Sequence, residues 1–392
     1  MKNSAGLNRG VVPSVDEQPR RPSPSRRHVL AGAGSLAVGS LAGCIGGFGS
    51  VEDPIDSYEP GATALESNAI SWSDLEDLKG ELVVYSGRTR DQIKPLFDEL
   101  EATYPDFSVS VDYDDNDDQL AKIREEVAGG ASQADLFYTQ DSGALAVLKA
   151  DGLTRALPSD VSQAVEDPYS DPDGEWTGVS GRVRAVLYNT DAFDGDDLPD
   201  DIFAYAEDDR FTGRISTRPN SGSFRAFIIA MMELHGESAT REWVRTMVED
   251  QEISEYQGGT AQAEAVAGGH QDIALGNQYY AGRILENDPS APIDVTFTEN
   301  DAGCLFNVSG VGILDSADRP NLAAEFLRHV LAAEGQEFFV QTNGEYPVLD
   351  GVDYVGDLPT LDEIDPPQFD LNRLGLELNE ARQLLREEGL SV

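Results

Sequence analysis

The alternation of short apolar strands with amphipathic helices is the feature that most constrains this chain. Residues 82–85 form an apolar run of the buried-strand type, and residues 107–113 alternate apolar with polar side chains. A helical pattern follows each of these two segments, and residues 134–139 read as a third strand. This order is typical of α/β proteins. The sequence therefore predicts mixed sheets with helices on both faces.

The second part of the chain repeats the same alternation. We expect strands at residues 183–188, 213–216 and 272–275, and a long helix at residues 223–235. A last helix is expected at residues 371–388, packed on the outside. With 392 residues, the chain is long enough to form two lobes rather than one compact core.

The charge balance excludes one class of partner and suggests an environment. The chain has 28 basic against 72 acidic residues, a formal net charge of −44. A field of this sign repels phosphate backbones, so nucleic-acid binding is excluded. The acids are spread along the chain, and the bases are five lysines and 23 arginines. Because high net charge maintains solubility when salt screens repulsion, we interpret the surface as adapted to salt, as in a halophile.

The N-terminal residues predict export rather than structure. The pair Arg26 and Arg27 precedes an uncharged stretch, residues 29–43, that is too short and too small to span a membrane comfortably. This order resembles a twin-arginine signal peptide, and Leu-Ala-Gly before Cys44 resembles a lipobox. We therefore expect residues 1–43 to be removed and Cys44 to carry lipid. Residues 44–70 read as a flexible tether to the outer face of the cytoplasmic membrane.

Four loops are candidates for a ligand site, because ligands of open α/β sheets bind beyond the carboxyl ends of the strands. The loops are residues 86–90, 140–142, 220–223 and 277–280. The third is small and polar before a long apolar helix, which suits either a bound anion or an ordinary N-cap. The fourth places Tyr279 and Tyr280 at the start of a helix, where both ligation and half-buried packing are open interpretations.

Five ordered segments resemble the ferric-ion-binding solute receptors of ABC importers. They are LVVYSGR (82–88), ADLFYTQDSGAL (134–145), VSGRVRAVLYNT (179–190), SGSF (221–224) and NQYY (277–280), and the match runs from about residue 80 to Pro347. The resemblance implies a two-lobed, type II periplasmic-binding-protein-like fold with a ligand cleft between the lobes. It places residues 71–180 and 310–392 in lobe 1 and residues 181–309 in lobe 2, with the chain crossing at hinge strands.

The resemblance also implies a metal site. In that family two adjacent tyrosines are iron ligands, and the matching positions in this chain are Tyr279 and Tyr280. Fe³⁺ is a hard cation that prefers anionic oxygen ligands, and phenolate is such a ligand. Phenol titrates near 10 in water, so the metal must displace protons and binding should weaken as pH falls.

In that family an anion, carbonate or phosphate, often joins the metal at a Ser-Gly helix start. The residues that would hold it here are Ser221, Gly222 and Ser223, with Asn277 nearby.

This chain departs from the family pattern in two loops. Thr89 stands where some members have a histidine, and Gln140 followed by Asp141 stands where they have a glutamate. No predicted site loop contains a histidine. Asp141 is thus the best remaining carboxylate ligand, unless it is an N-cap, and Gln140 is a candidate donor beside the ligands. Arg182 is a candidate partner for the anion, unless it forms a hinge salt bridge.

The expected function is therefore capture of ferric iron, as the ion or as a complex, by a monomeric receptor that delivers it to an ABC permease and its ATPase. Carbonate, water or a small chelator would supply the remaining ligands. No enzyme is expected, because the chain has neither Gly-x-Ser-x-Gly nor His-Glu-x-x-His and only four histidines. The alternative is the same fold with another cargo: a polyamine, a sugar phosphate or an oxyanion.

Overall fold

The computed structural model describes residues 70–392 except 131, 166, 350–357 and 377, and it confirms the predicted α/β architecture. The predicted signal peptide, the lipobox cysteine and almost all of the predicted tether lie outside the described residues. In the part of the chain that the structure describes, no helix combines the length and the apolar character that a membrane span needs.

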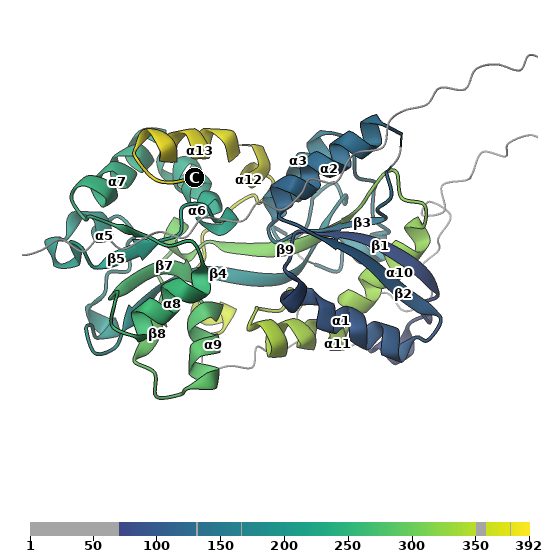
Figure 1. The fold of residues 1–392 in the computed structure, drawn as a ribbon, viewed down its shortest axis with the longest axis horizontal. Helices are drawn as coiled ribbons and strands as arrows, with labels where there is room; N and C mark the ends of the chain where they lie inside the picture. Colours follow the sequence, from purple (N-terminus) through teal and green to yellow (C-terminus); the bar gives the residue numbers. More distant parts are fainter. Residues whose placement is uncertain (1–69, 131, 166, 350–357, 377) are drawn as a thin grey trace, which may run out of the picture. The chain divides into compact units, whose positions relative to one another are not determined.

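The strands form one continuous path whose order is β2-β1-β3-β9-β4-β7-β5-β6, with β8 paired to β4 (Figure 1). Pairs β1–β2, β1–β3, β5–β6 and β5–β7 are parallel, whereas β9 and β4 pair antiparallel with their neighbours. The strand bounds are β1 Gly80–Ser86, β2 Phe107–Tyr113, β3 Leu136–Tyr138, β4 Thr177–Asn189, β5 Ile215–Thr217, β6 Ser254–Glu255, β7 Ile273–Asn277, β8 Ile293–Thr296 and β9 Phe306–Ile313.

Strands β4 and β9 run side by side between two halves of the fold (Figure 1). The first part of β4 pairs with β9, and its last part pairs with β7 and β8 in the second half. Every residue of β4 is buried. The sequence predicted only residues 183–188 of this strand, because Gly178, Ser180 and Gly181 before them favour turns. Gly181 is required by packing, since a Cβ there would lie 1.9 Å from Cζ of Phe306.

The first half packs helices around β1, β2 and β3. One face of α1 buries Ile93, Leu96, Phe97 and Leu100, which recur at the spacing of an amphipathic helix. The helices of this half are α1 Arg90–Thr103, α2 Asn116–Ala128, α3 Ser142–Ala150, α4 Ser159–Ser162, α10 Pro320–Val330 and α11 Ala333–Phe338.

The second half packs helices around β5, β7 and the end of β4. Its longest helix, α6, is apolar over most of its surface and buries seven residues, as a helix enclosed in a core must. The helices of this half are α5 Ala204–Glu207, α6 Gly222–His235, α7 Glu237–Glu249, α8 Gly259–Ala267 and α9 Tyr279–Asn287. Short 3₁₀ turns lie at Trp72–Asp74, Gly195–Asp197, Asp209–Phe211, Ala302–Cys304 and Leu361–Glu363, and a π turn lies at Phe339–Asn343.

The C-terminal segment differs from its prediction in two ways. It forms two helices, α12 (Arg373–Leu376) and α13 (Leu378–Glu387), rather than one. Helix α12 contacts both α3 and α6, and α13 packs on α6 in the second half. Helix α13 thus packs on the second half, whereas the sequence analysis assigned all of residues 310–392 to the first lobe. The reason is that its apolar residues, including Leu384 and Leu385, are buried against the second half.

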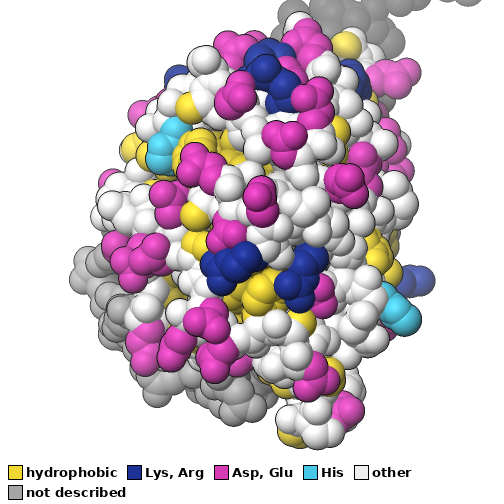
Figure 2. Space-filling model, turned by 90° about the vertical axis from the view of Figure 1, so that its left-hand side faces the viewer, with side chains coloured by type: hydrophobic (Ala, Val, Ile, Leu, Met, Phe, Trp, Pro, Cys, Tyr) yellow, Lys and Arg dark blue, Asp and Glu magenta, His cyan; other side chains and the backbone are white. Residues whose placement is uncertain are grey.

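The outer surface carries acidic side chains over the whole face that Figure 2 shows, with few basic ones among them. This distribution agrees with the charge balance of the sequence and differs from the lining of the cavity described next.

Candidate metal centre

One cavity of about 670 Å³ collects all the residues that the sequence predicted for the site. It is lined by the loops that follow β1, β2 and β3 and by the ends of the second-half strands. The predicted residues that line it are Gln140, Asp141, Arg182, Ser221, Gly222, Ser223, Asn277, Tyr279 and Tyr280.

The two tyrosines lie at the junction of β7 and α9. Their ring centroids are 4.4 Å apart at an interplanar angle of 45°, and Tyr279 is 3% exposed. Burial raises the pKa of the Tyr280 phenol, and the neighbouring Tyr279 raises it further. Gly259 makes room for the second ring, because a Cβ at this glycine would lie 2.2 Å from Cζ of Tyr280. Both phenols are therefore placed at the cavity by packing from two helices, α8 and α9.

A chain of hydrogen bonds connects the start of α6 to the tyrosine pair. The Ser223 hydroxyl donates to Oδ1 of Asn277 at 2.7 Å, and Nδ2 of Asn277 donates to the Tyr279 hydroxyl at 3.3 Å. Because Oδ1 of Asn277 accepts from Ser223, the Nδ2 group of the same amide faces Tyr279 and donates to its hydroxyl oxygen.

Ser221 is the N-cap of α6, which is one of the two interpretations that the sequence left open. Its hydroxyl accepts from the Phe224 amide at 3.0 Å and donates to the Arg218 carbonyl at 2.9 Å. The hydroxyl is therefore used within the protein. The amides of Gly222 and Ser223 lie in the first turn and have no partner inside the helix, so they remain suited to an anion.

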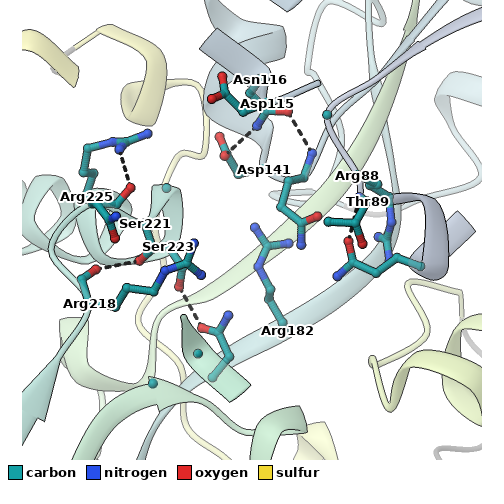
Figure 3. Close-up of a pocket in the computed structure, with 18 of the residues that line it drawn as sticks. Arg88, Thr89, Asp115, Asn116, Asp141, Arg182, Arg218, Ser221, Ser223 and Arg225 are labelled. Atoms are coloured by element: carbon teal, nitrogen blue, oxygen red, sulfur yellow. Dashed lines mark hydrogen bonds between the residues drawn. The ribbon is translucent and has the colours of Figure 1, made fainter. Parts of the chain in front are cut away.

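Asp141 reaches the same helix start from the opposite side of the cavity. Although it occupies the N-cap position of α3, its side chain makes no capping hydrogen bond. Its carboxylate accepts from Nδ2 of Asn116 at 2.8 Å, and a Cβ on Gly222 would lie 2.7 Å from its Oδ2 (Figure 3). The carboxylate thus lies against the first turn of α6. Asn116 also accepts from the Gln140 amide at 3.1 Å, which holds this loop in place.

The arginines are the part of the lining that the sequence analysis missed, apart from Arg182. Two of them have carboxylate partners: Arg88 lies 2.9 Å from buried Glu345, and Arg225 lies 3.5 Å from Asp117. The hinge salt bridge considered for Arg182 is therefore made by Arg88 instead. The arginines that line the cavity are Arg88, Arg90, Arg182, Arg184, Arg218 and Arg225. The Arg-Val-Arg spacing in β4 is the one signal that predicts part of this lining, because alternate residues share a face of a strand.

The described histidines lie away from the cavity, as the sequence predicted. His235 contacts the Phe203 ring, and His270 is exposed in the turn after α8. The imidazole of His329 is buried beside the Tyr104 hydroxyl, 3.0 Å from its Nε2, and burial lowers its pKa. Among the described residues, oxygen donors are thus the candidate ligands of a metal here.

Comparison with known proteins agrees with the geometry. A family model described as bacterial extracellular solute-binding protein matches residues 131–369. The chain belongs to this family. The "Iron uptake protein A1" of Synechocystis sp. is 31% identical over 284 residues, which cover 70% of this chain and 77% of that protein.

Two solved structures share the fold of this chain over nearly their whole length. Iron-bound HitA from Pseudomonas aeruginosa has a TM-score of 0.73 and 28% identity, and the match covers 79% of this chain and 99% of HitA. A Trichodesmium protein (IdiA, FutA) in complex with iron and citrate ligands has a TM-score of 0.69 and 26% identity. The match covers 80% of this chain and 100% of the Trichodesmium protein. The resemblance inferred from the sequence segments is thereby confirmed.

Proposed function

We propose that this chain is the substrate-binding receptor of an ABC transporter and that it captures ferric iron for a membrane permease and its ATPase. The observation that carries the proposal is the adjacent pair Tyr279 and Tyr280, which lines the cavity together with a donor to Tyr279. Relatives named for ferric iron or iron uptake support it. Binding is then the activity itself, and no catalytic step is involved.

The donor set fits Fe³⁺ better than a soft metal. Two phenolates and the Asp141 carboxylate are hard, anionic oxygen ligands, whereas the described part of the lining contains no cysteine or histidine. Three such negative charges balance the charge of one ferric ion. Tyr279 and Tyr280 come from the second half and Asp141 from the first, so a metal held by all three would bring the two sides of the cavity together.

The proposal includes the cellular setting that the sequence suggests. After the signal peptide is removed, lipid on Cys44 would hold a monomer on the outer face of the cytoplasmic membrane, with residues 44–70 as the tether. The two lobes would be residues 71–180 with 310–372, and residues 181–309 with α13. Closure of the lobes over the metal would be the state that the permease recognises. The acidic surface suits a salt-rich exterior.

A spectroscopic titration tests the proposal. Phenolate bound to Fe³⁺ produces a charge-transfer band in the visible range, so the full-length chain in high-salt buffer should gain this band at one iron per protein. We expect Tyr279→Phe and Tyr280→Phe each to weaken or shift the band and the double variant to lose it. Tyr256→Phe, which does not line the cavity, is the matched control. If the unaltered chain neither retains iron nor shows the band, iron is not the cargo.

Among the alternative cargoes, the arginines of the cavity favour an anion over a cationic polyamine. A polyamine is cationic, brings no anionic ligands of its own, and would meet six arginines against four aspartates in the lining, so it is disfavoured. An oxyanion or a sugar phosphate is compatible with such a lining and is the second candidate. Tight binding of a phosphorylated sugar without any iron-dependent colour would favour it.

A further inference from the structure

Gln278 precedes the first tyrosine of the pair, and its side chain is completely buried. It makes no capping hydrogen bond to α9, although it occupies the N-cap position of that helix. Its amide group contacts the backbone of two other segments instead. Oε1 accepts from the Val183 amide at 3.0 Å, and Nε2 donates to the Gly344 carbonyl at 3.3 Å. One buried side chain thus joins three segments that are far apart in the sequence.

Val183 is the residue at which β4 changes partners. Residues up to Val183 pair with β9, and residues from Arg184 onward pair with β7. The backbone amide of Gln278 donates to the Val183 carbonyl at 3.2 Å, so Gln278 contacts both backbone polar groups of this residue. Its side chain thereby replaces the backbone acceptor that β7 no longer supplies once the chain turns into α9. Because a buried hydrogen bond is costly to leave unmade, Gln278 and this point of β4 are held together.

The second partner of this side chain lies in a loop, residues 343–346, that we call the hinge loop. The first half holds the hinge loop from one side. Glu345 accepts from Arg88 at 2.9 Å, and Nδ2 of Asn343 donates to the Gln92 carbonyl at 3.0 Å. Both first-half partners line the cavity. The hinge loop is therefore tied to the segment of the first half that follows β1.

Helix α9 holds the hinge loop from the other side. Besides the contact of Gln278, Nη2 of Arg283 donates to the Asn343 carbonyl at 3.2 Å. Gly344 has a left-handed φ of 63°, and a Cβ at this glycine would lie 3.6 Å from Cβ of Tyr279. The hinge loop thus passes beside the first tyrosine and contacts both sides of the cavity, so a change in the angle between the halves must alter these contacts.

Another buried glutamine shows what a purely structural contact looks like. Gln251 is 2% exposed, and the described partners of its side chain are three residues of the second half: Ala206, Asp208 and Thr212. These contacts stay within one half. Gln278 differs because its partners lie on the strand that crosses between the halves and in a loop that both halves hold.

We propose that Gln278 is a positioning residue that couples the tyrosine pair to the hinge. This inference rests on the proposed function. Iron bound by Tyr279 and Tyr280 fixes the start of α9, and Gln278 transmits this constraint through its hydrogen bonds to β4 and to the hinge loop. The hinge loop passes it on to the first half through Arg88. Loss of the Gln278 amide therefore leaves the metal ligands in place and separates metal binding from closure of the two halves.

Hydrogen exchange of the full-length chain, with and without ferric nitrilotriacetate in high-salt buffer, tests the coupling. In the unaltered chain we expect iron to slow exchange of the hinge-loop amides by about tenfold or more. One of them, the Tyr346 amide, donates to the Gly181 carbonyl at 2.8 Å. Gln278→Met keeps the length of the side chain and removes both of its hydrogen-bonding groups. In this variant we expect the visible band of bound iron to remain and the iron-dependent protection of the hinge loop to disappear.

A second measurement follows the release of iron to a chelator. Without the coupling, the halves close less firmly over the metal, so Gln278→Met should release iron about tenfold faster than the unaltered chain. Gln251→Met removes a similarly buried amide group and is the matched control. It should lower the stability and leave both the iron-dependent protection and the release rate unchanged, which excludes a general loss of folding as the cause.

Three results would overturn the inference. The first is iron-dependent protection of the hinge loop in Gln278→Met that equals that of the unaltered chain. The second is a visible band in the unaltered chain without any such protection. The third is loss of the band in Gln278→Met but not in Gln251→Met, which would make Gln278 a support of the tyrosine rings alone.

The two readouts separate this inference from the proposed function. The visible band reports the tyrosines, and the exchange of the hinge-loop amides reports the coupling. A band without coupling leaves the iron function standing and removes only the role of Gln278. If no iron source produces the band in the unaltered chain, the iron function itself fails, and this inference fails with it.

Discussion

The two sides of the cavity differ in burial and in hydrogen bonding. The second half supplies a tyrosine wall, made of Asn277, Tyr279 and Tyr280 with the start of α6, whose members are mostly buried and hydrogen-bonded to one another. The first half supplies an acidic wall from the loops after β1, β2 and β3, where Thr89, Asp114 and Asp115 are exposed. One wall is thus preformed, and the other is open to water.

This difference suggests that the two walls have different roles in selecting the metal. Rigid, desolvated donors select a metal by geometry and charge, because they do not rearrange to suit another ion. Exposed acids at the rim are weakly held and are screened by salt, so they contribute little to selection. We therefore expect affinity to depend mainly on the tyrosine wall. Four measurements test this difference between the two walls.

Acid should release iron through the tyrosine wall, and this is the largest effect expected. Phenols are protonated near neutral pH, and burial raises the pKa of Tyr280 further, so iron binding must displace protons. Affinity should fall by about tenfold per pH unit for each proton displaced, or roughly a hundredfold for two. Chelator competition between pH 8 and pH 6 measures this slope. Tyr280→Phe should reduce it by one proton, and an unchanged slope would contradict the assignment.

Removing the buried pair at the hinge should destabilise the whole fold. Glu345 accepts from Arg88 at 2.9 and 3.0 Å and from the Ser180 hydroxyl at 2.8 Å, which ties a loop of the first half to β4. Glu345→Gln leaves the Arg88 charge buried without a partner, and we expect a loss of about 3–5 kcal/mol in the free energy of unfolding.

Urea denaturation in high salt measures this loss. The exposed pair of Lys79 and Asp77 is the matched control, since Asp77→Asn should change the stability by less than about 1 kcal/mol. Equal effects of the two substitutions would show that the hinge pair is not specially stabilising.

Gly259→Ala should misplace one ring of the tyrosine wall. The added methyl group would lie 2.2 Å from Cζ of Tyr280, so the ring must move away from its position. We expect roughly tenfold weaker iron binding with a shifted visible band, about 1.4 kcal/mol. Gly258→Ala is the control, because a Cβ there meets nothing within 4 Å. Identical iron binding by the two variants would show that the ring position does not matter.

On the acidic wall the expected effects are smallest. Asp141→Asn removes a single carboxylate that Asn116 already holds, and we expect iron affinity to fall by less than about tenfold. Asp115→Asn, at the exposed rim, should have no measurable effect. A loss at Asp141 as large as that of a tyrosine substitution would show that the two walls contribute equally.

The tyrosine wall was also the more predictable one from the sequence. Adjacent tyrosines and a Ser-Gly-Ser helix start are local patterns, and a local pattern survives folding because its residues remain neighbours. The alternating strands and helices were predictable for the same reason, through their hydrophobic periods. Tyr279 is buried at the cavity rather than half-buried, and its role as a metal ligand stays a prediction.

Other features were not predictable because they depend on long-range packing. Arg182 and Arg184 on β4 meet Arg218, which precedes α6, only in the folded chain, and no window of sequence contains all three. The short strand β8 was missed, since only its pairing with β4 defines it. The division between α12 and α13 and the position of α13 on α6 depend on surfaces that form only in the folded chain.

The C-terminal segment offers a built-in place for a reporter. Because α12 contacts α3 and α6, which belong to different halves, the segment cannot keep both contacts unchanged when the cavity widens. The described cysteine, Cys304, is buried, so a thiol introduced at the exposed Ser391 would be the more reactive one in a chain that lacks Cys44. A fluorophore attached there would turn cargo capture into an optical signal and make the receptor a sensor.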